Sequence, residues 1–151
     1  MNDYKIIFLD VDGVLNRIWG ENRTNLNQRQ LEPKLVKHLE KIIQDTNASI
    51  IVSSTWRILG MVRLWNGLKE LDFPYYDRII ARTGKRGSAQ RGLEILDTVN
   101  EMGLTHWITL EDEPLHMYQY IPSSRIIKTH GDIGLTVELA EEAISTLNSE
   151  E

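Results

Sequence analysis

The sequence predicts an α/β fold, a three-layer sandwich in which helices cover both faces of a Rossmann-like parallel sheet. Short apolar runs, bounded by polar or turn-forming residues, alternate with longer segments whose apolar residues recur at helical spacing. This alternation favours parallel pairing, because a helix between two parallel strands packs back onto one face of the sheet. The chain contains no internal repeat, low-complexity tract or linker. We therefore expect a single domain over residues 1–151.

The N-terminal half contains the first two expected strands. The first covers residues 4–9, an apolar run closed by polar residues and a glycine. Residues 16–30 are polar and rich in Asn and Arg, which is typical of a loop or flap. A helix is expected from Leu31, with Pro33 near its front and an apolar face at Leu35, Leu39, Ile42 and Ile43. Residues 48–52 are the second expected strand, and a second helix should carry Ile58, Val62, Trp65 and Leu68 on one face.

The C-terminal half continues the alternation. Pro74 should break the second helix before a third strand at residues 78–81. A third helix follows and should end at Gly103, and residues 107–110 and 125–128 are expected as the fourth and fifth strands. The last two helices have apolar residues at Leu93, Leu96 and Val99, and at Val137, Ala140, Ile144 and Leu147.

The composition excludes several classes of protein. The chain has 41% apolar and 26% charged residues, which is typical of a globular protein. Its net charge of −5 argues against a basic nucleic-acid-binding surface over the whole molecule. The absence of cysteine excludes disulfides, thiolate metal sites and a cysteine nucleophile. The first apolar run is too short for a signal peptide or a membrane span, so we expect a cytoplasmic protein without membrane contact or an obligate protein partner.

Four acidic residues directly follow two of the expected strands. Asp10 and Asp12 follow the first strand, and Glu111 and Asp112 follow the fourth. Because ligands bind beyond the carboxyl ends of parallel strands, these side chains should meet at one edge of the sheet. They would repel one another without a cation, and Mg²⁺ prefers a few carboxylates together with water and phosphate oxygens. The pattern therefore predicts a Mg²⁺ site with these four residues as candidate ligands.

The spacing of Asp10 and Asp12 suits two different chemical roles. Asp10 would attack phosphorus as a nucleophile, whereas Asp12 would protonate the leaving oxygen and then activate water. Gly13 permits the close backbone turn that this arrangement needs. A hydroxyl at the end of the second strand, from Ser53 or Ser54, would hold a phosphoryl oxygen. A cation beyond the third strand would neutralise charge in the transition state.

These residues resemble the motifs of haloacid dehalogenase (HAD)-type phosphatases. Residues 10–14 (DVDGV) are similar to the first motif, Asp-x-Asp-Gly-x-[Thr/Val], and residues 50–53 (IIVS) resemble the second. Residues 108–112 (ITLED) resemble the acidic fourth motif, and Arg91 lies where the family has a single Lys or Arg as its third motif. A more specific resemblance, to the HAD domain of Swiss Army Knife-type RNA-repair proteins, extends over nearly the whole chain and rests on residues 54–57, 91–95, 111–114 and 134–136.

The resemblance implies a strand order of 5-4-1-2-3, with the first-motif strand central and with a minimal cap or none. It also implies a Mg²⁺-dependent phosphomonoesterase that works through an aspartyl-phosphate on Asp10. Ser53 and Arg91 would bind the phosphoryl group. The backbone carbonyl of Asp12 would join Asp10 and Asp112 as a metal ligand.

The sequence departs from the family pattern in its fourth motif. The family usually has Asp-Asp there, so Glu111 would reach the metal directly from a shifted backbone or through water. The third-motif cation is also ambiguous, with Arg91 preferred and Lys85 as the alternative. We further expect Ser54, Arg57 and Lys85 to contact the substrate, which would be a small phosphate ester or the end of a nucleotide or oligonucleotide.

Each motif also has a purely structural interpretation. The first could be a turn or part of a calcium loop, although the EF-hand requires a final Glu that is missing here. The two serines could cap a helix, and residues 111–113 could form a solvated acidic turn. Trp56, Trp65 and Trp107 are expected to pack rather than to stack on bases, and Trp19 in the flap is the exception to test. Two functional alternatives also remain: a nucleic-acid end-processing (polynucleotide) phosphatase, which a basic group around Lys85 would serve, and a non-catalytic binding module.

Overall fold

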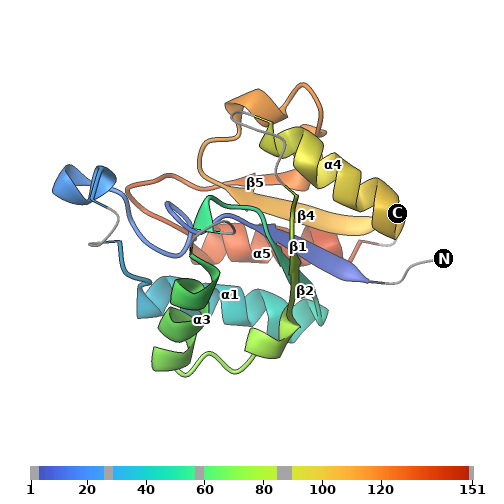
Figure 1. Cartoon of the computed structure of the whole chain (residues 1–151). Helices are drawn as coiled ribbons and strands as arrows, with labels where there is room; N and C mark the ends of the chain where they lie inside the picture. The colour runs from blue at the N-terminus through green and yellow to red at the C-terminus, as the bar shows by residue number, and fades with distance from the viewer. Residues whose placement is uncertain (1–3, 26–28, 57–59, 85–89, 150–151) are drawn as a thin grey trace.

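The computed structural model describes residues 4–25, 29–56, 60–84 and 90–149. Its centre is a five-stranded parallel sheet of order β3-β2-β1-β4-β5 (Figure 1). The strands are β1 (Lys5–Leu9), β2 (Ser49–Val52), β3 (Ile79–Arg82), β4 (His106–Glu111) and β5 (Ile126–Lys128). The expected strand order is confirmed, and every strand boundary lies within one residue of its expected position.

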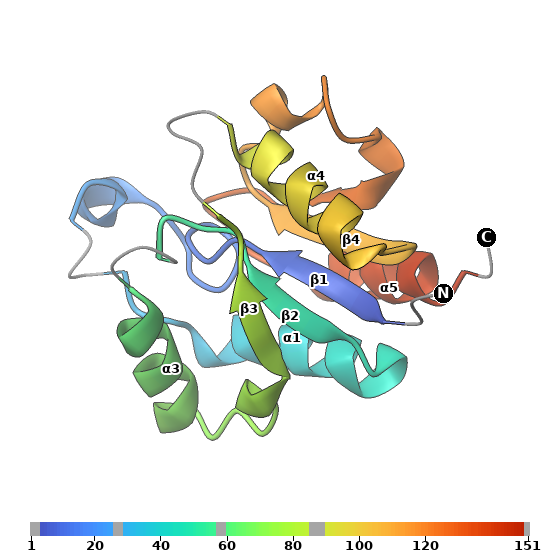
Figure 2. The same cartoon turned by 45° about the vertical axis from the view of Figure 1, so that its right-hand side comes forward.

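Helices cover both faces of the sheet (Figures 1 and 2). One face packs against α1 (Pro33–Thr46), α3 (Met61–Glu70) and α5 (Val137–Leu147), and the other packs against α4 (Arg91–Met102). Alternate residues of β1 divide the two cores, since side chains alternate between the faces of a strand. Ile7 and Leu9 belong to the first core, whereas Ile6 and Phe8 belong to the second. The three-layer α/β/α architecture is thereby confirmed.

The buried face of α3 differs from the expected one. Leu68 is completely buried as expected, but Val62 and Trp65 are 69% and 49% exposed, and Leu64 is completely buried instead. Met61 and Leu71 also pack against this core, so the buried stripe has helical spacing but lies on a neighbouring face. Both stripes contain apolar residues at helical spacing, so the pattern alone did not distinguish them. Ile58, the first residue of the expected stripe, lies outside the described residues.

The backbone ladder continues past the strands and brings the candidate residues to one edge of the sheet. The Asp10 amide donates to the Leu110 carbonyl at 3.1 Å, and the Ser53 amide donates to the Leu9 carbonyl at 2.8 Å. On the other side of β4, the Thr129 amide donates to the Glu111 carbonyl at 3.0 Å. The residues that follow β1, β2, β4 and β5 therefore begin side by side.

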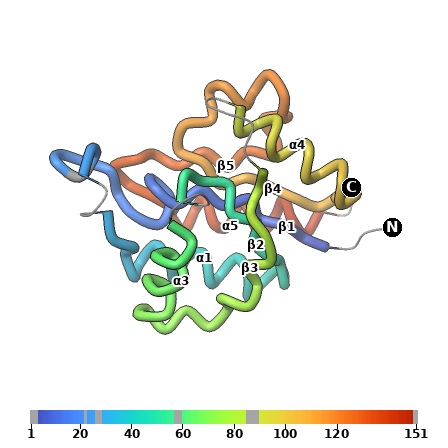
Figure 3. Tube along the Cα trace, in the orientation of Figure 1, coloured from blue at the N-terminus to red at the C-terminus, as the bar shows by residue number. Residues whose placement is uncertain are grey.

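The chain that follows β1 extends beyond the carboxyl ends of the strands, as the trace in Figure 3 shows. Within residues 10–25 it contains one short 3-10 helix, η1 (Gly20–Arg23), which agrees with the expected minimal cap. None of the helices that the structure describes is long and apolar enough to cross a membrane.

Candidate functional site

The turn after β1 brings its backbone against the loop after β4. Gly13 has φ +81°, a conformation that favours glycine. A Cβ atom built on it would lie 2.3 Å from Oδ2 of Asp112, closer than any side chain permits. The Thr129 hydroxyl, just past β5, donates to the Gly13 carbonyl at 2.7 Å. The predicted role of Gly13 therefore has a physical basis, because its missing side chain is what lets Asp112 approach.

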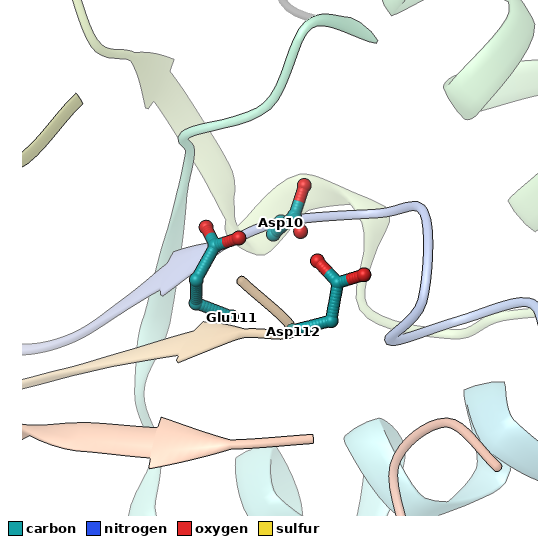
Figure 4. Close-up of side chains that lie close together, drawn as sticks. All are labelled: Asp10, Glu111 and Asp112. Atoms are coloured by element: carbon teal, nitrogen blue, oxygen red, sulfur yellow. The ribbon is translucent and has the colours of Figure 1, made fainter. Parts of the chain in front are cut away.

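Three carboxylates converge at this edge of the sheet. Asp10, Glu111 and Asp112 each offer an oxygen, and these oxygens all lie within 4.8 Å of one another (Figure 4). Asp10 is only 4% exposed and Glu111 only 2%. Burial raises the pKa of Asp10 well above its ordinary value; Arg91 lowers it, and the Asp112 carboxylate raises it further. The cluster therefore favours a bound cation, which would offset the repulsion among its members.

The donor set suits a hard divalent cation. Oxygen ligands from a small number of carboxylates, with room left for water and phosphate, are what Mg²⁺ prefers. Asp10, Asp112 and Glu111 would supply these oxygens. Within the described residues, the carboxylate of Asp12 is not part of the cluster, so the metal role expected for Asp12 concerns its backbone carbonyl.

Arg91, the first residue of α4, reaches into the acidic cluster. Its guanidinium forms a hydrogen-bonded ion pair with Glu111, and its Nη2 lies 3.8 Å from Oδ2 of Asp10. The Nε of Arg91 is buried and has no hydrogen-bond partner in the described part of the chain. Glu111 is held from both sides, because its other oxygen accepts from the Glu113 amide at 3.1 Å. The structure thus places Arg91 at the site, while Lys85, the alternative cation, lies outside the described residues.

The two serines after β2 differ in their surroundings, although both are buried. The Ser54 hydroxyl accepts a hydrogen bond from the Trp56 amide at 3.2 Å, as a serine in a turn commonly does. The Ser53 hydroxyl has no hydrogen-bond partner among the residues described. A buried polar group without a partner is costly, so Ser53 is the hydroxyl that an incoming oxygen would satisfy. Arg57, expected to contact substrate, lies outside the described residues.

Asp12 is held by three side chains that the sequence analysis did not connect with it. The Asn16 amide donates to its Oδ1 at 3.0 Å. Its Oδ2 accepts from the Trp56 indole Nε1 at 3.0 Å and from Arg29 Nη1 at 3.1 Å. The expectation that Trp56 only packs in the core is therefore incomplete, since its ring is buried but its N–H fixes Asp12. Arg29 and Trp56 are distant from Asp12 in sequence, and no spacing rule connects them with it.

Comparison with known proteins agrees with this geometry. A family model described as the HAD domain in Swiss Army Knife RNA repair proteins matches residues 6–140. The matched range includes the acidic cluster, Ser53, Arg91 and all three partners of Asp12. No curated protein matches the chain significantly.

Proposed function

The chain belongs to the family of HAD domains found in Swiss Army Knife RNA repair proteins, and from this we propose that it is a Mg²⁺-dependent phosphomonoesterase with Asp10 as nucleophile. Family membership supports a phosphatase-type function, and the site geometry supports the finer assignment. The observation that carries it is the convergence of Asp10, Glu111 and Asp112 within 4.8 Å, next to the Arg91 guanidinium.

In the proposed reaction, a carboxylate oxygen of Asp10 attacks phosphorus while the bond from phosphorus to the leaving oxygen breaks. Asp12 gives that oxygen its proton, so the alcohol leaves neutral. Asp12 then takes a proton from water, and the water oxygen attacks the aspartyl-phosphate. This second step releases inorganic phosphate and restores the carboxylate of Asp10.

The remaining groups would bind the phosphoryl oxygens. The Ser53 hydroxyl would donate to one of them, and the Arg91 guanidinium would offset their negative charge. Mg²⁺, when held by Asp10, Asp112 and Glu111, would neutralise the charge that develops on the phosphoryl group. Glu111 also orients Arg91 through their ion pair, so it links the metal-binding and phosphate-binding parts of the site.

The direct test is hydrolysis of an aryl phosphate by the wild-type protein with Mg²⁺ and with excess chelator. We expect Mg²⁺-dependent release of phosphate, with a loss of at least about 100-fold in rate after chelation. Readdition of Mg²⁺ should restore the rate. A protein that binds Mg²⁺ but hydrolyses no phosphate ester would contradict the proposal and support the alternative of a non-catalytic binding module.

A polynucleotide end is a second candidate substrate. The family description, which names RNA repair proteins, favours it. The basic group that would follow a polynucleotide consists of Lys85 and Arg86 together with Arg78, Arg82 and Arg91, and it contributes less than expected to this proposal. Arg78 lies before β3, at the amino ends of the strands, where its guanidinium bonds to the Asn47 backbone. Lys85 and Arg86 lie outside the described residues.

The hydrogen bond from Trp56 to Asp12 should matter most when the leaving group needs a proton. We expect Trp56→Phe, which keeps the ring and removes the N–H, to lower kcat for an alkyl phosphate about tenfold. An aryl phosphate with an acidic phenol as its leaving group should be much less affected, because that group leaves with little protonation. Steady-state kinetics on both esters would measure this difference. Trp65→Phe, on the exposed side of α3, is the matched control. Equal losses on both esters in Trp56→Phe would indicate a structural role only.

A further inference from the structure

A groove of about 680 Å³ is lined by two residues that contact Asp12, namely Arg29 and Trp56. It lies between the segment that leads into α1 and the helix α3, and Arg29, Trp56, Arg63 and Asn66 are among the residues that line it. A larger groove of about 790 Å³, lined by residues of α1 and α5, contains none of the candidate site residues. We therefore assign the smaller groove to the site, because residues that line it contact Asp12.

Arg29 and Trp56 connect the groove to the catalytic acid. Both donate to Oδ2 of Asp12 and both line the groove, so these two side chains form a wall that Asp12 and the groove share. In the proposed reaction Asp12 protonates the oxygen that leaves with the alcohol. The alcohol that is attached to this oxygen would therefore start at this wall and continue into the groove.

Arg63 brings a positive charge to the groove, whereas the charge of Arg29, which also lines it, is offset by its ion pair with Asp12. Glu70 is the acid among the described residues that line the groove. The Arg63 guanidinium is fixed in place, because it lies 4.8 Å from the centre of the Trp56 ring and its Nη2 donates to the Arg29 carbonyl at 3.1 Å. A cation held in this way favours an anion in the groove.

The contact between the Arg63 guanidinium and the Trp56 ring argues that the groove recognises its ligand by charge rather than by aromatic stacking. The guanidinium of Arg63 covers the Trp56 ring, which leaves that face without room for a planar group of the substrate. We propose that the groove binds the alcohol part of the substrate and selects alcohols that carry a second phosphoryl group, with Arg63 as the residue that contacts it. This inference rests on the proposed phosphatase function.

The test compares pairs of substrates of which one member carries a second phosphoryl group, either as a free phosphate or within a phosphodiester. The first pair is butyl phosphate and 1,4-butanediol bisphosphate, and the second is a nucleoside monophosphate and a dinucleotide with a terminal phosphate. We expect the wild-type kcat/KM to be about tenfold or more higher for the member of each pair that carries the second phosphoryl group. A preference in the first pair alone would assign the groove to free phosphate groups, and one in the second pair alone would assign it to phosphodiesters.

Variants then show which residue causes the preference. Arg63→Met should lower the ratio of the two kcat/KM values about tenfold, mainly through KM, and Arg63→Lys should retain part of it. Lys69→Met is the matched control, because Lys69 is exposed on the same helix and does not line the groove. Its ratio should equal that of the wild type. An Arg63→Met variant that slows both members of a pair equally would overturn the proposal.

A binding measurement separates this proposal from the proposed function. Calorimetry with Mg²⁺ on the Asp10→Asn protein, which should bind esters without hydrolysing them, should show tighter binding of 1,4-butanediol bisphosphate than of butyl phosphate, and adding Arg63→Met should remove the difference. If no ester is hydrolysed but this difference appears, the proposed reaction fails and the groove assignment stands. If esters are hydrolysed without any preference and binding is equal, only the groove assignment fails.

Discussion

Asp10→Asn is expected to reduce phosphatase turnover by at least about 10⁴-fold, because the amide cannot attack phosphorus. Asn has nearly the same shape, and the buried site should therefore keep its backbone arrangement. An assay with an aryl phosphate and saturating Mg²⁺ measures the loss. Asp77→Asn is the matched control, since Asp77 is exposed before β3, at the opposite edge of the sheet. Wild-type turnover in Asp10→Asn would remove Asp10 as the nucleophile.

When both proteins are free of metal at neutral pH, Asp10→Asn should be more stable than the wild type. Burial raises the pKa of Asp10 in the folded state, so the folded protein binds this proton more tightly than the unfolded chain does. This difference in pKa lowers the free energy of unfolding of the wild type. The loss is absent below the unfolded pKa of about 3.9, grows as the pH rises toward the folded pKa, and is complete above it. Thermal unfolding of Asp10→Asn should therefore show a higher Tm than the wild type at pH 7, and the difference should shrink toward pH 4. A lower Tm at pH 7 would contradict this account.

Asp112→Asn should be the most damaging substitution for metal binding. Both oxygens of Glu111 already accept, one from Arg91 and one from the Glu113 amide, whereas Asp112 lies against Gly13 and next to Asp10. We expect the Mg²⁺ concentration for half-maximal activity to rise at least about 100-fold in Asp112→Asn, and only about tenfold in Glu111→Gln. Mg²⁺ titrations of the rate measure both values.

Asp112→Asn and Glu111→Gln should also differ in their effect on kcat. Glu111→Gln weakens the ion pair that orients Arg91, so the kcat of this variant should remain low even at saturating Mg²⁺. A variant impaired only in metal affinity would regain its kcat under this condition. Glu113→Gln is the control, because this neighbouring side chain is exposed and lies outside the cluster of three. A Glu111→Gln defect that saturating Mg²⁺ fully rescues would assign Glu111 to the metal alone.

The strands were predictable because each is a short apolar run, and their meeting at one edge because parallel strands bring their carboxyl ends together, whereas their order was implied only by the resemblance to HAD-type phosphatases. The acidic cluster followed from the same rule, since Asp10 and Asp112 directly follow paired strands. The buried face of α3 was not predictable, because two apolar stripes of equal spacing competed and only contact with the sheet separates them. The contacts of Arg29 and Trp56 with Asp12 were missed for a related reason: they join segments distant in sequence, and burial of a tryptophan ring does not reveal where its N–H points.

The position of β1 in the sheet also governs when the site forms during synthesis. β1 pairs with β2, which lies about 40 residues away, but its other neighbour, β4, begins at His106. A nascent chain that has emerged only through β3 contains Asp10, Asp12 and Ser53 but not Arg91, Glu111 or Asp112. The carboxylates are therefore kept apart until the second half of the chain pairs with β1. Their mutual repulsion accordingly arises only when β4 pairs with β1.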